Sequence, residues 1–493
     1  MPGFFLAALS LVGAGAVLLA TSQHGAGLSP DAVGYIGVAR QLLAGQGVVG
    51  YEGQPLVIQP PLFPVLLALG GWIGGMDPLL VVPLVNALFC GAAVYLTGRL
   101  CNHYQQLFPT LAPFGPAFAL LSWPLFAVGV MAWSEPLFIC LGLLCLLSLG
   151  RHLEKGGVGS LAAAACWAGL ACLTRYIGLT FILGGGLVLL MYSPRPWRRR
   201  LVHACWFGVV AALPLALWLG RNHALTGTLL GPRYPSSHSL LENLALTFTG
   251  LSAFWVPEVL VPQGLARLGL GVLSGLVMVG ASWGWLRASS AAKNTLSRLG
   301  PVVIWAAVYA LFLISSSTTT AYDDINLRLL APLYGPVVVL LLAGAGQLEE
   351  RGWHRAVRVG LVVLLLVPLA GISWAGARYA REGAGAGTGA DRYNTAPWQG
   401  SETIHYLQQH QLQGPLYSNA PDGLYILCGI QAAWWPRRGA EEGWPRAGHL
   451  IWLDAVRRTY LVGPDQLQTR VYLQEQTRFA DGAIYEIAPK EEE

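Results

Sequence analysis

The chain has 493 residues, of which 54% are hydrophobic and only 11% are charged. Typical soluble domains carry about 25% charged residues, so this composition excludes a wholly soluble protein and predicts a polytopic α-helical membrane protein. The formal net charge of +5 is small, and we expect it to reflect basic anchors in cytoplasmic loops and not a nucleic-acid-binding patch. The eight cysteines form no CxxC motif, and none lies at the spacing from a histidine that is typical of metal ligands. The sequence therefore predicts no metal site.

The first apolar segment covers residues 4–20. No Lys or Arg precedes it and no convincing cleavage site follows it. These features favour a retained membrane helix over a signal peptide.

An acidic residue, Asp31, stands at the mouth of this first segment. After it, apolar residues from Tyr35 to Leu43 recur at helical spacing, which predicts a short amphipathic helix. Gly45 and Gly47 end this helix.

The turn Gln59-Pro60-Pro61 leads into a second apolar helix at residues 61–73. This helix is shorter than the ~20 residues that a bilayer requires, so we expect it to lie in the interface. An acid at the membrane surface, between two helices that do not span, is a place for chemistry. A connecting loop with an Asp helix cap would have the same pattern.

The distribution of basic residues sets the orientation of the spans. Further spans are expected at about residues 78–98, 110–131, 135–150, 160–174, 177–192, 201–219, 266–286, 301–316, 329–346 and 357–375. The loops on one side then hold most of the basic residues, including four arginines within residues 195–200. Taking that side as cytoplasmic predicts about 11 spans, a cytoplasmic N-terminus, and an extracytoplasmic Asp31 and C-terminus.

A set of polar side chains falls at the outer ends of these spans. Its members, the candidate substrate-binding residues, are Tyr35, Gln59, Glu135, Arg175, Arg221, Arg233, Tyr234, Asp323, Asp324 and Arg328. Each alone is typical of an interface anchor or a local ion pair. Charged groups at membrane depth are costly and mark functional paths, so together they predict one cavity in which arginines hold a phosphate.

The composition changes beyond the last span. The Gly/Ala-rich run REGAGAGTGA predicts a flexible linker, placed at residues 377–394. We therefore expect a transmembrane domain at residues 1–376 and a small extracytoplasmic α/β domain at residues 395–493. In this domain, helices are predicted at about 398–413 and 464–478, and strands at about 415–418, 450–453 and 484–487.

The order of motifs over residues 1–375 resembles the GT-C class of membrane glycosyltransferases. It resembles in particular the bacterial branch related to protein O-mannosyltransferases and lipid A aminoarabinose transferase. The resemblance rests on the pattern D-x-x-x-Y-x-x-x-A-x-x-L from Asp31, on the Pro-rich turn, and on the motifs around Glu135, Arg175, Arg221 and Arg328. The run YSNAPD at residues 417–422 also looks like part of the outer domain of bacterial members.

The resemblance implies an inverting transfer of a sugar from a polyprenyl-phosphate donor to a lipid, glycan or protein acceptor, on the outer face of the plasma (inner) membrane. It implies that Asp31 is the general base, since such a transfer needs one base, and that the outer arginines stabilise the leaving phosphate. Many members carry a second acid where this chain has Ala32, so no metal ligands are assigned and a divalent cation stays open. Asp323 and Asp324 could bind sugar hydroxyls, hold an arginine or help bind a cation.

Two other classes of function fit part of the sequence. A transporter or flippase of a lipid-linked solute would explain the polar groups at membrane depth, but it would be favoured by internal repeats, and none is visible. An assembly or anchoring protein would leave Asp31 as a helix cap, and Asp31→Asn would then leave its function intact.

Overall fold

The computed structural model of the chain describes residues 3–261, 264, 269, 290–321, 323–387, 392–438, 444, 445, 447–458, 460–463 and 471–489. The chain separates into two compact units. The first unit comprises Met1–Leu19, Pro55–Leu66 and Pro83–Ala377, and the second comprises Ala20–Gln54, Leu67–Val82 and Arg378–Glu493.

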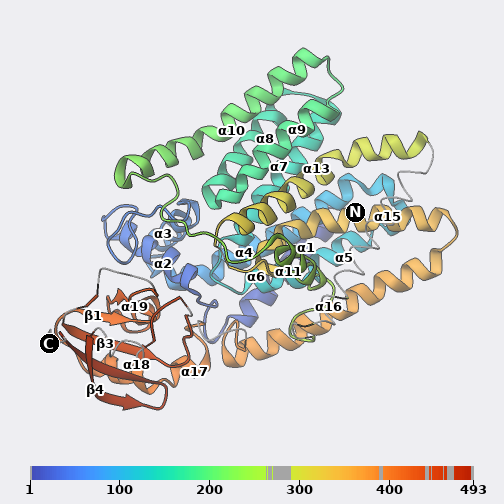
Figure 1. Cartoon of the computed structure of the whole chain (residues 1–493). Helices are drawn as coiled ribbons and strands as arrows, with labels where there is room; N and C mark the ends of the chain where they lie inside the picture. Colours follow the sequence, from blue (N-terminus) through green and yellow to red (C-terminus); the bar gives the residue numbers. More distant parts are fainter. Residues whose placement is uncertain are drawn as a thin grey trace. The chain divides into compact units, whose positions relative to one another are not determined.

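Helices dominate the described chain up to residue 382 (Figure 1). Their bounds are α1 (Gly3–Ala20), α2 (Pro30–Leu43), α3 (Leu62–Gly74), α4 (Pro78–His103), α5 (Phe114–Leu120), α6 (Trp123–Gly129), α7 (Glu135–Lys155), α8 (Val158–Thr174), α9 (Leu179–Tyr192), α10 (Trp197–Thr226), α11 (Leu240–Ser252), α13 (Ser290–Thr319), α14 (Leu327–Leu330), α15 (Tyr334–Glu350) and α16 (His354–Glu382). The last helix extends into the segment expected to be a linker.

Among the described residues, seven helical segments are long and apolar enough to cross a membrane. They begin at residues 3, 78, 135, 197, 298, 327 and 354, and four shorter apolar helices accompany them. This confirms the expected class of polytopic helical membrane protein. One of the shorter helices is α3, which has 13 residues and is too short to span without help.

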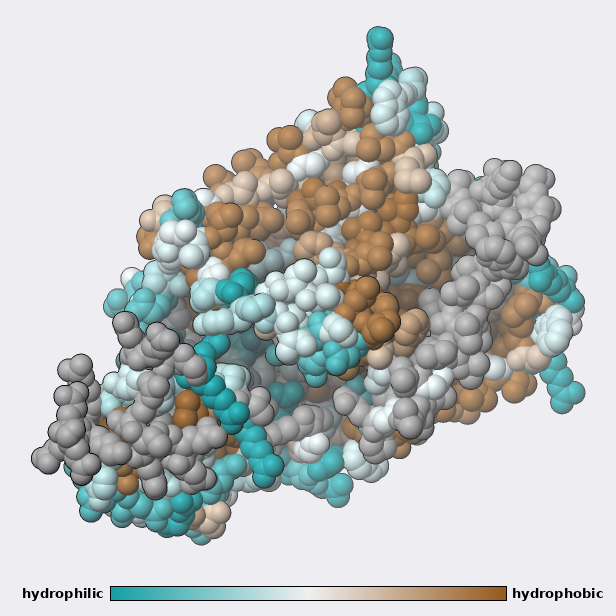
Figure 2. All heavy atoms as spheres, viewed as in Figure 1, coloured by the Kyte–Doolittle hydropathy of each residue, from teal (hydrophilic) through white to brown (hydrophobic). Residues whose placement is uncertain are grey.

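Two of the apolar segments are mostly buried: 83% of the most apolar stretch of α7 and 78% of that of Leu327–Glu350, which includes α15, are buried. In contrast, only 17% of the most apolar stretch of α10 is buried. Figure 2 shows apolar side chains gathered along α10. In this helix Val209 and Leu217 are each about two-thirds exposed. Exposed apolar surface of this extent is what a lipid-facing helix requires, whereas α7 packs against α8, α9 and α13.

The span expected at residues 110–131 is not one continuous helix. The structure has two helices of seven residues there, α5 and α6. Ser122 caps the start of α6 by accepting a hydrogen bond from the amide of Leu125, and Pro124 stands in the first turn. A cap followed by proline starts a new helix, and a hydropathy pattern does not detect this break.

The segment between residues 221 and 263, expected as a loop, contains the helix α11. Ser239 and Glu242 form a capping box at its start, which is the sequence signature of a helix N-terminus. The expected span at 266–286 lies outside the described residues, apart from residue 269.

The second unit contains α2 and a small sheet. Its strands are β1 (Leu416–Ser418), β2 (Ala433–Trp434), β3 (Gly448–Leu453), β4 (Val471–Phe479) and β5 (Gly482–Pro489), in the order β2-β1-β3-β5-β4. β1 pairs in parallel with β2 and β3, and the β3–β5 and β4–β5 pairs are antiparallel. The helices α17 (Ala396–Gln399), α18 (Glu402–Gln409) and α19 (Pro421–Cys428) complete the expected α/β domain.

Two predicted helices of this domain differ from the structure. The helix expected at 398–413 is divided at Gly400 into α17 and α18. Residues 471–478, expected to be helical, form the strand β4, and residues 464–470 lie outside the described residues. Among the described strands, β4 pairs only with β5, and most of its side chains are at least partly exposed. In the sequence, its polar residues therefore resemble the solvent face of a helix.

The start of α18 is tied to the β4–β5 turn by Asp481. Its carboxylate accepts hydrogen bonds from the Ser401 hydroxyl, and from the Thr403 hydroxyl at 2.7 Å and amide at 3.2 Å. Burial alone would raise the pKa of Asp481, but these hydrogen bonds lower it below its usual value. The ionised carboxylate therefore stabilises this corner of the domain.

Candidate active site

A buried carboxylate lies at the N-terminus of α7 in the first unit. Glu135 is only 1% exposed, and its Oε1 accepts hydrogen bonds from Arg175 Nη1 and Arg328 Nε, both at 2.5 Å. Its Oε2 has no hydrogen-bond partner in the part of the chain that the structure describes. We call Glu135, Arg175 and Arg328 the Glu135 cluster.

Helix breaks bring the two arginines to Glu135. Arg175 is the residue after α8, and its extended backbone (φ −150°, ψ 137°) separates α8 from the next helical turn. Arg328 is held on α14, whose first turn is capped by the Asn326 side chain. Its guanidinium lies 4.3 Å from the ring centroid of Trp133, at a distance suited to a cation–π contact.

The Glu135 cluster places two guanidinium groups beside one buried carboxylate. Asp323 lies 3.6 Å from Arg328, but its side chain is 71% exposed, so water screens much of its charge. Of the three roles open to Asp323, the structure supports holding an arginine. Guanidinium groups at a largely buried site are suited to bind a phosphate through paired hydrogen bonds.

A second group of polar side chains fixes the backbone just before Gln59. Arg221 donates to the carbonyl of residue 56 at 2.6 Å, the Tyr176 hydroxyl to that of residue 57 at 2.7 Å, and Arg233 to that of residue 58 at 3.1 Å. Three consecutive carbonyls are thus held from α10, from the break after α8, and from the segment after α10. Gln59 itself is half-buried.

Tyr176 joins this group to the bundle. Its hydroxyl also accepts hydrogen bonds from Trp218 Nε1 at 3.0 Å and Asn222 Nδ2 at 3.3 Å. Sequence reasoning did not include Tyr176, Asn222 or Trp133 among the candidate residues. Two signals were available, because Tyr176 adjoins Arg175 and Asn222 adjoins Arg221, whereas nothing in the sequence marks Trp133.

The two remaining candidates of the first unit, Tyr234 and Asp324, have separate partners. The side chain of Tyr234 is half exposed, while its backbone carbonyl accepts from the amide of Ala321 at 2.8 Å. Asp324 pairs with His238 at 3.0 Å, whereas its neighbour Asp323 faces Arg328.

Asp31 and Tyr35 belong to the second unit, on α2. The N-cap of α2 is Ser29, whose side chain accepts from the amide of Ala32. Asp31 therefore lies inside the first helical turn, half-buried, and the interpretation that it is the cap is wrong. Tyr35, one turn later, is only 3% exposed.

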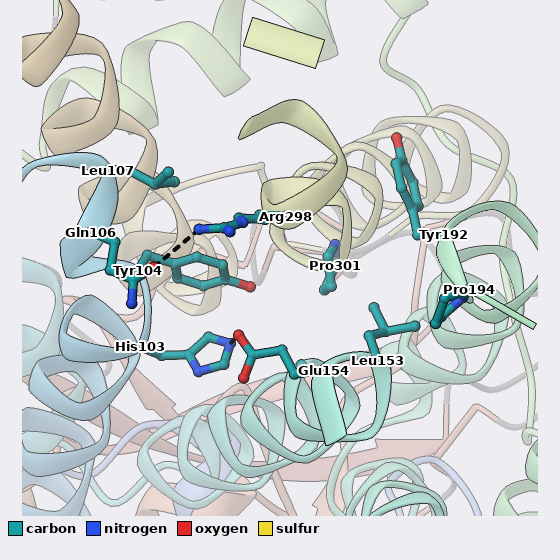
Figure 3. A pocket seen from close by; sticks show the side chains of 11 residues that line it. His103, Tyr104, Gln106, Leu107, Leu153, Glu154, Tyr192, Pro194, Arg298 and Pro301 are labelled. Carbon is teal, nitrogen blue, oxygen red and sulfur yellow. Dashed lines mark hydrogen bonds and ion pairs between the residues drawn. The ribbon is translucent and has the colours of Figure 1, made fainter. Parts of the chain in front are cut away.

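A pocket of about 230 Å³ lies at the other end of α7, where His103 Nε2 is 3.6 Å from Glu154 and Arg298 donates to Gln106 (Figure 3). At 1.5 Å per residue, Glu154 is about 28 Å along the helix from Glu135. This pocket is therefore separate from the Glu135 cluster. No group of His, Cys, Asp or Glu suited to a metal ion occurs among the residues that the structure describes.

No protein-family model matches the chain, and no curated protein matches its sequence. Solved structures share its fold. ArnT from Cupriavidus metallidurans, in a crystal structure bound to undecaprenyl phosphate, matches over 97% of both chains with a TM-score of 0.59 and 14% identity. The oligosaccharyltransferase of Archaeoglobus fulgidus matches over 98% of this chain and 73% of its own, with a TM-score of 0.54 and 9% identity. The mycobacterial arabinofuranosyltransferase AftD matches over 99% of this chain and 42% of its own, with a TM-score of 0.53 and 16% identity. The expected GT-C fold is confirmed.

Proposed function

We propose that the protein is an inverting glycosyltransferase that moves a sugar from a polyprenyl-phosphate donor to a lipid, glycan or protein acceptor on the outer face of the membrane. The observation that carries this proposal is the Glu135 cluster, in which one buried carboxylate holds two arginines. A fold alone does not define a function, whereas these side chains have the chemistry that binding a phosphate requires. The end-to-end likeness to ArnT, whose structure contains undecaprenyl phosphate, supports the choice of donor.

The Glu135 cluster suits the leaving group. In the transfer, the bond between the anomeric carbon and the phosphate oxygen breaks, and negative charge grows on the lipid phosphate. Arg175 and Arg328 supply cations where water is scarce, and fixed donors are most effective there. Glu135 keeps both guanidiniums in place before the donor arrives, which lowers the ordering cost of binding.

Asp31 takes the role of base. As the acceptor hydroxyl oxygen attacks the anomeric carbon from the face opposite the phosphate, its proton passes to the Asp31 carboxylate. A single displacement of this kind inverts the anomeric centre and needs one base. Because Ser29 already caps α2, the Asp31 carboxylate is not required for that structural task.

The test is sugar transfer in membranes of cells that lack the protein, complemented with wild type, Asp31→Asn or Asp77→Asn at equal expression. Asp77 is the matched control, because it is an Asp of the same unit in a half-exposed ion pair with Arg40. A panel of radiolabelled polyprenyl-phosphate sugars is offered. We expect transfer from one donor with wild type and Asp77→Asn, and a loss of at least about 100-fold with Asp31→Asn, the range for a general base.

Equal transfer by wild type and Asp31→Asn would remove Asp31 from the mechanism. A failure of wild type with every donor would contradict the proposed function. A lipid-flipping assay on the same membranes would then examine the transporter alternative.

A further inference from the structure

The segment that leads from α1 into α2 has a partner far along the chain. Asn394 Nδ2 donates to the carbonyls of His24 at 2.8 Å and Ala26 at 2.7 Å, and its Oδ1 accepts from the amide of Leu28 at 3.0 Å. An asparagine amide offers two N–H donors and one oxygen acceptor. The amide nitrogen and the amide oxygen of Asn394 thus both bind one short stretch of backbone. Leu28, the nearest of these residues in sequence, is 366 positions before Asn394.

The position of this contact relative to α2 is important. Leu28 immediately precedes Ser29, the cap of α2, and Asp31 follows in the first turn. The backbone amide of Tyr393 also donates to the Leu28 carbonyl at 3.1 Å, so both polar backbone groups of Leu28 are held. A shift of this segment would move the start of α2 and the Asp31 carboxylate with it.

Asn394 is itself held firmly. It is only 7% exposed, and the neighbouring Tyr393 is fully buried. The Tyr393 hydroxyl donates to Asp422 at 2.8 Å, and Arg458 pairs with the same carboxylate at 2.9 Å. Asp422 lies in the first turn of α19, so the contact to residues 24–28 is anchored in the core of the C-terminal domain.

The segment after α2 contacts the same domain. The ring of Tyr51 stacks on that of Tyr425, with centroids 4.7 Å apart. Gln431 donates to the Tyr51 carbonyl at 3.0 Å. Tyr51 also packs against Gly37 in the middle of α2, where an added Cβ would lie 2.9 Å from the Cβ of Tyr51. The domain therefore contacts the chain on both sides of α2.

We propose that Asn394 is a positioning residue for Asp31, and that the C-terminal domain thereby takes part in catalysis. The inference rests on the proposed role of Asp31 as the base. Asn394 acts through residues 24–28 and does not touch the reacting atoms. Misplacing a base by about 1 Å lowers a rate on the order of 100-fold, so a clamp of this kind has a measurable effect on turnover.

The domain offers a matched control in Asn419. Its Nδ2 donates to the carbonyls of Leu453 at 2.9 Å and Val456 at 3.0 Å, and its Oδ1 accepts from the Leu453 amide at 3.0 Å. Asn419 thus makes the same three kinds of hydrogen bond and is also buried (0% exposed, against 7% for Asn394), but its partners lie within the C-terminal domain. Asn394→Ala and Asn419→Ala remove equivalent interactions at different places.

The experiment compares wild type with the two variants as full-length protein in nanodiscs. For Asn394→Ala we expect kcat per folded enzyme to fall 10- to 100-fold with the KM for the donor little changed, because the phosphate-binding arginines are unaltered. For Asn419→Ala we expect less than about a threefold change in kcat per folded enzyme. Equal losses of kcat in both variants would overturn the inference, since they would show a purely structural role.

Hydrogen–deuterium exchange gives a readout that does not depend on activity. Asn394→Ala is expected to raise exchange in peptides that cover residues 24–36, and Asn419→Ala is expected to leave them as in wild type. Unchanged exchange in Asn394→Ala would also overturn the inference. If wild type transferred no sugar, the proposed function would fail, and the exchange data would still decide whether Asn394 holds this segment.

Discussion

Replacing Glu135 by glutamine tests the Glu135 cluster most directly. The variant keeps the shape of the side chain and removes the buried charge that Arg175 and Arg328 share. The arginine side chains are only 18% and 9% exposed, so water can compensate little of the lost interaction. Removing one partner of a buried ion pair costs about 3–5 kcal/mol.

This loss of stability can be measured as a decrease in the melting temperature (Tm) of the detergent-solubilised protein. A loss of 1 kcal/mol shifts Tm by about 2–4 °C for 150–250 residues and by less for larger units, so we expect a decrease of roughly 3–10 °C. The matched control is Glu349→Gln, since Glu349 is 3% exposed and pairs with Arg358 at 3.1 Å. Because the Arg358 side chain is 55% exposed, we expect the loss of the Glu349–Arg358 ion pair to cost only about 1–2 kcal/mol.

A double variant separates the ion-pair energy from other effects of the substitution. Adding Arg175→Gln to Glu135→Gln removes one of the two guanidinium charges that Glu135 would otherwise balance. We expect the double variant to be more stable than the sum of the single effects by about 0.5–3 kcal/mol. Additive effects, or a Glu135→Gln variant as stable as wild type, would refute the interpretation of the Glu135 cluster as a coupled buried ion pair.

Three further predictions concern other parts of the chain. Tyr176→Phe leaves the indole N–H of Trp218 unpaired and should cost about 1–3 kcal/mol; an unchanged Tm would contradict this. Gly142→Ala should destabilise by about 1–3 kcal/mol, because its Cβ would overlap the buried ring of Phe181. Gly186→Ala has open space around it and should be neutral or stabilising. Asp481→Asn should make the stability of the C-terminal domain less sensitive to acid. Burial alone raises the pKa of Asp481, but its hydrogen bonds hold this pKa below the usual value. The stabilisation by the carboxylate is therefore complete above about pH 4 and is lost as the pH falls through the lowered folded pKa. Proteolysis of the domain between pH 5 and 2 measures this, and parallel curves for variant and wild type would contradict it.

Some of the wrong predictions have a common physical cause. Hydropathy is averaged over a window, so it did not detect the break at Ser122 that divides residues 110–131 into two helices. The strand β4 lies at the edge of its sheet, where exposed polar side chains on both faces obscure the period of two that identifies a strand. A helix cap decided the structure in the first case and pairing with a neighbouring strand decided it in the second, and the average polarity of the segment reports neither.

The sequence by itself determined the membrane class, most of the helices and the positions of the polar residues at their ends, because these depend on apolar length and on local capping. The tertiary structure alone decided which of these residues meet. Glu135 is 40 residues from Arg175 and 193 from Arg328, and Asn394 is more than 360 from the segment it holds. Contacts over such separations depend on how helices pack and where they break, and one sequence carries no local signal for either. The neighbours Asp323 and Asp324 illustrate this, since equal chemistry one residue apart is directed to Arg328 in one case and to His238 in the other.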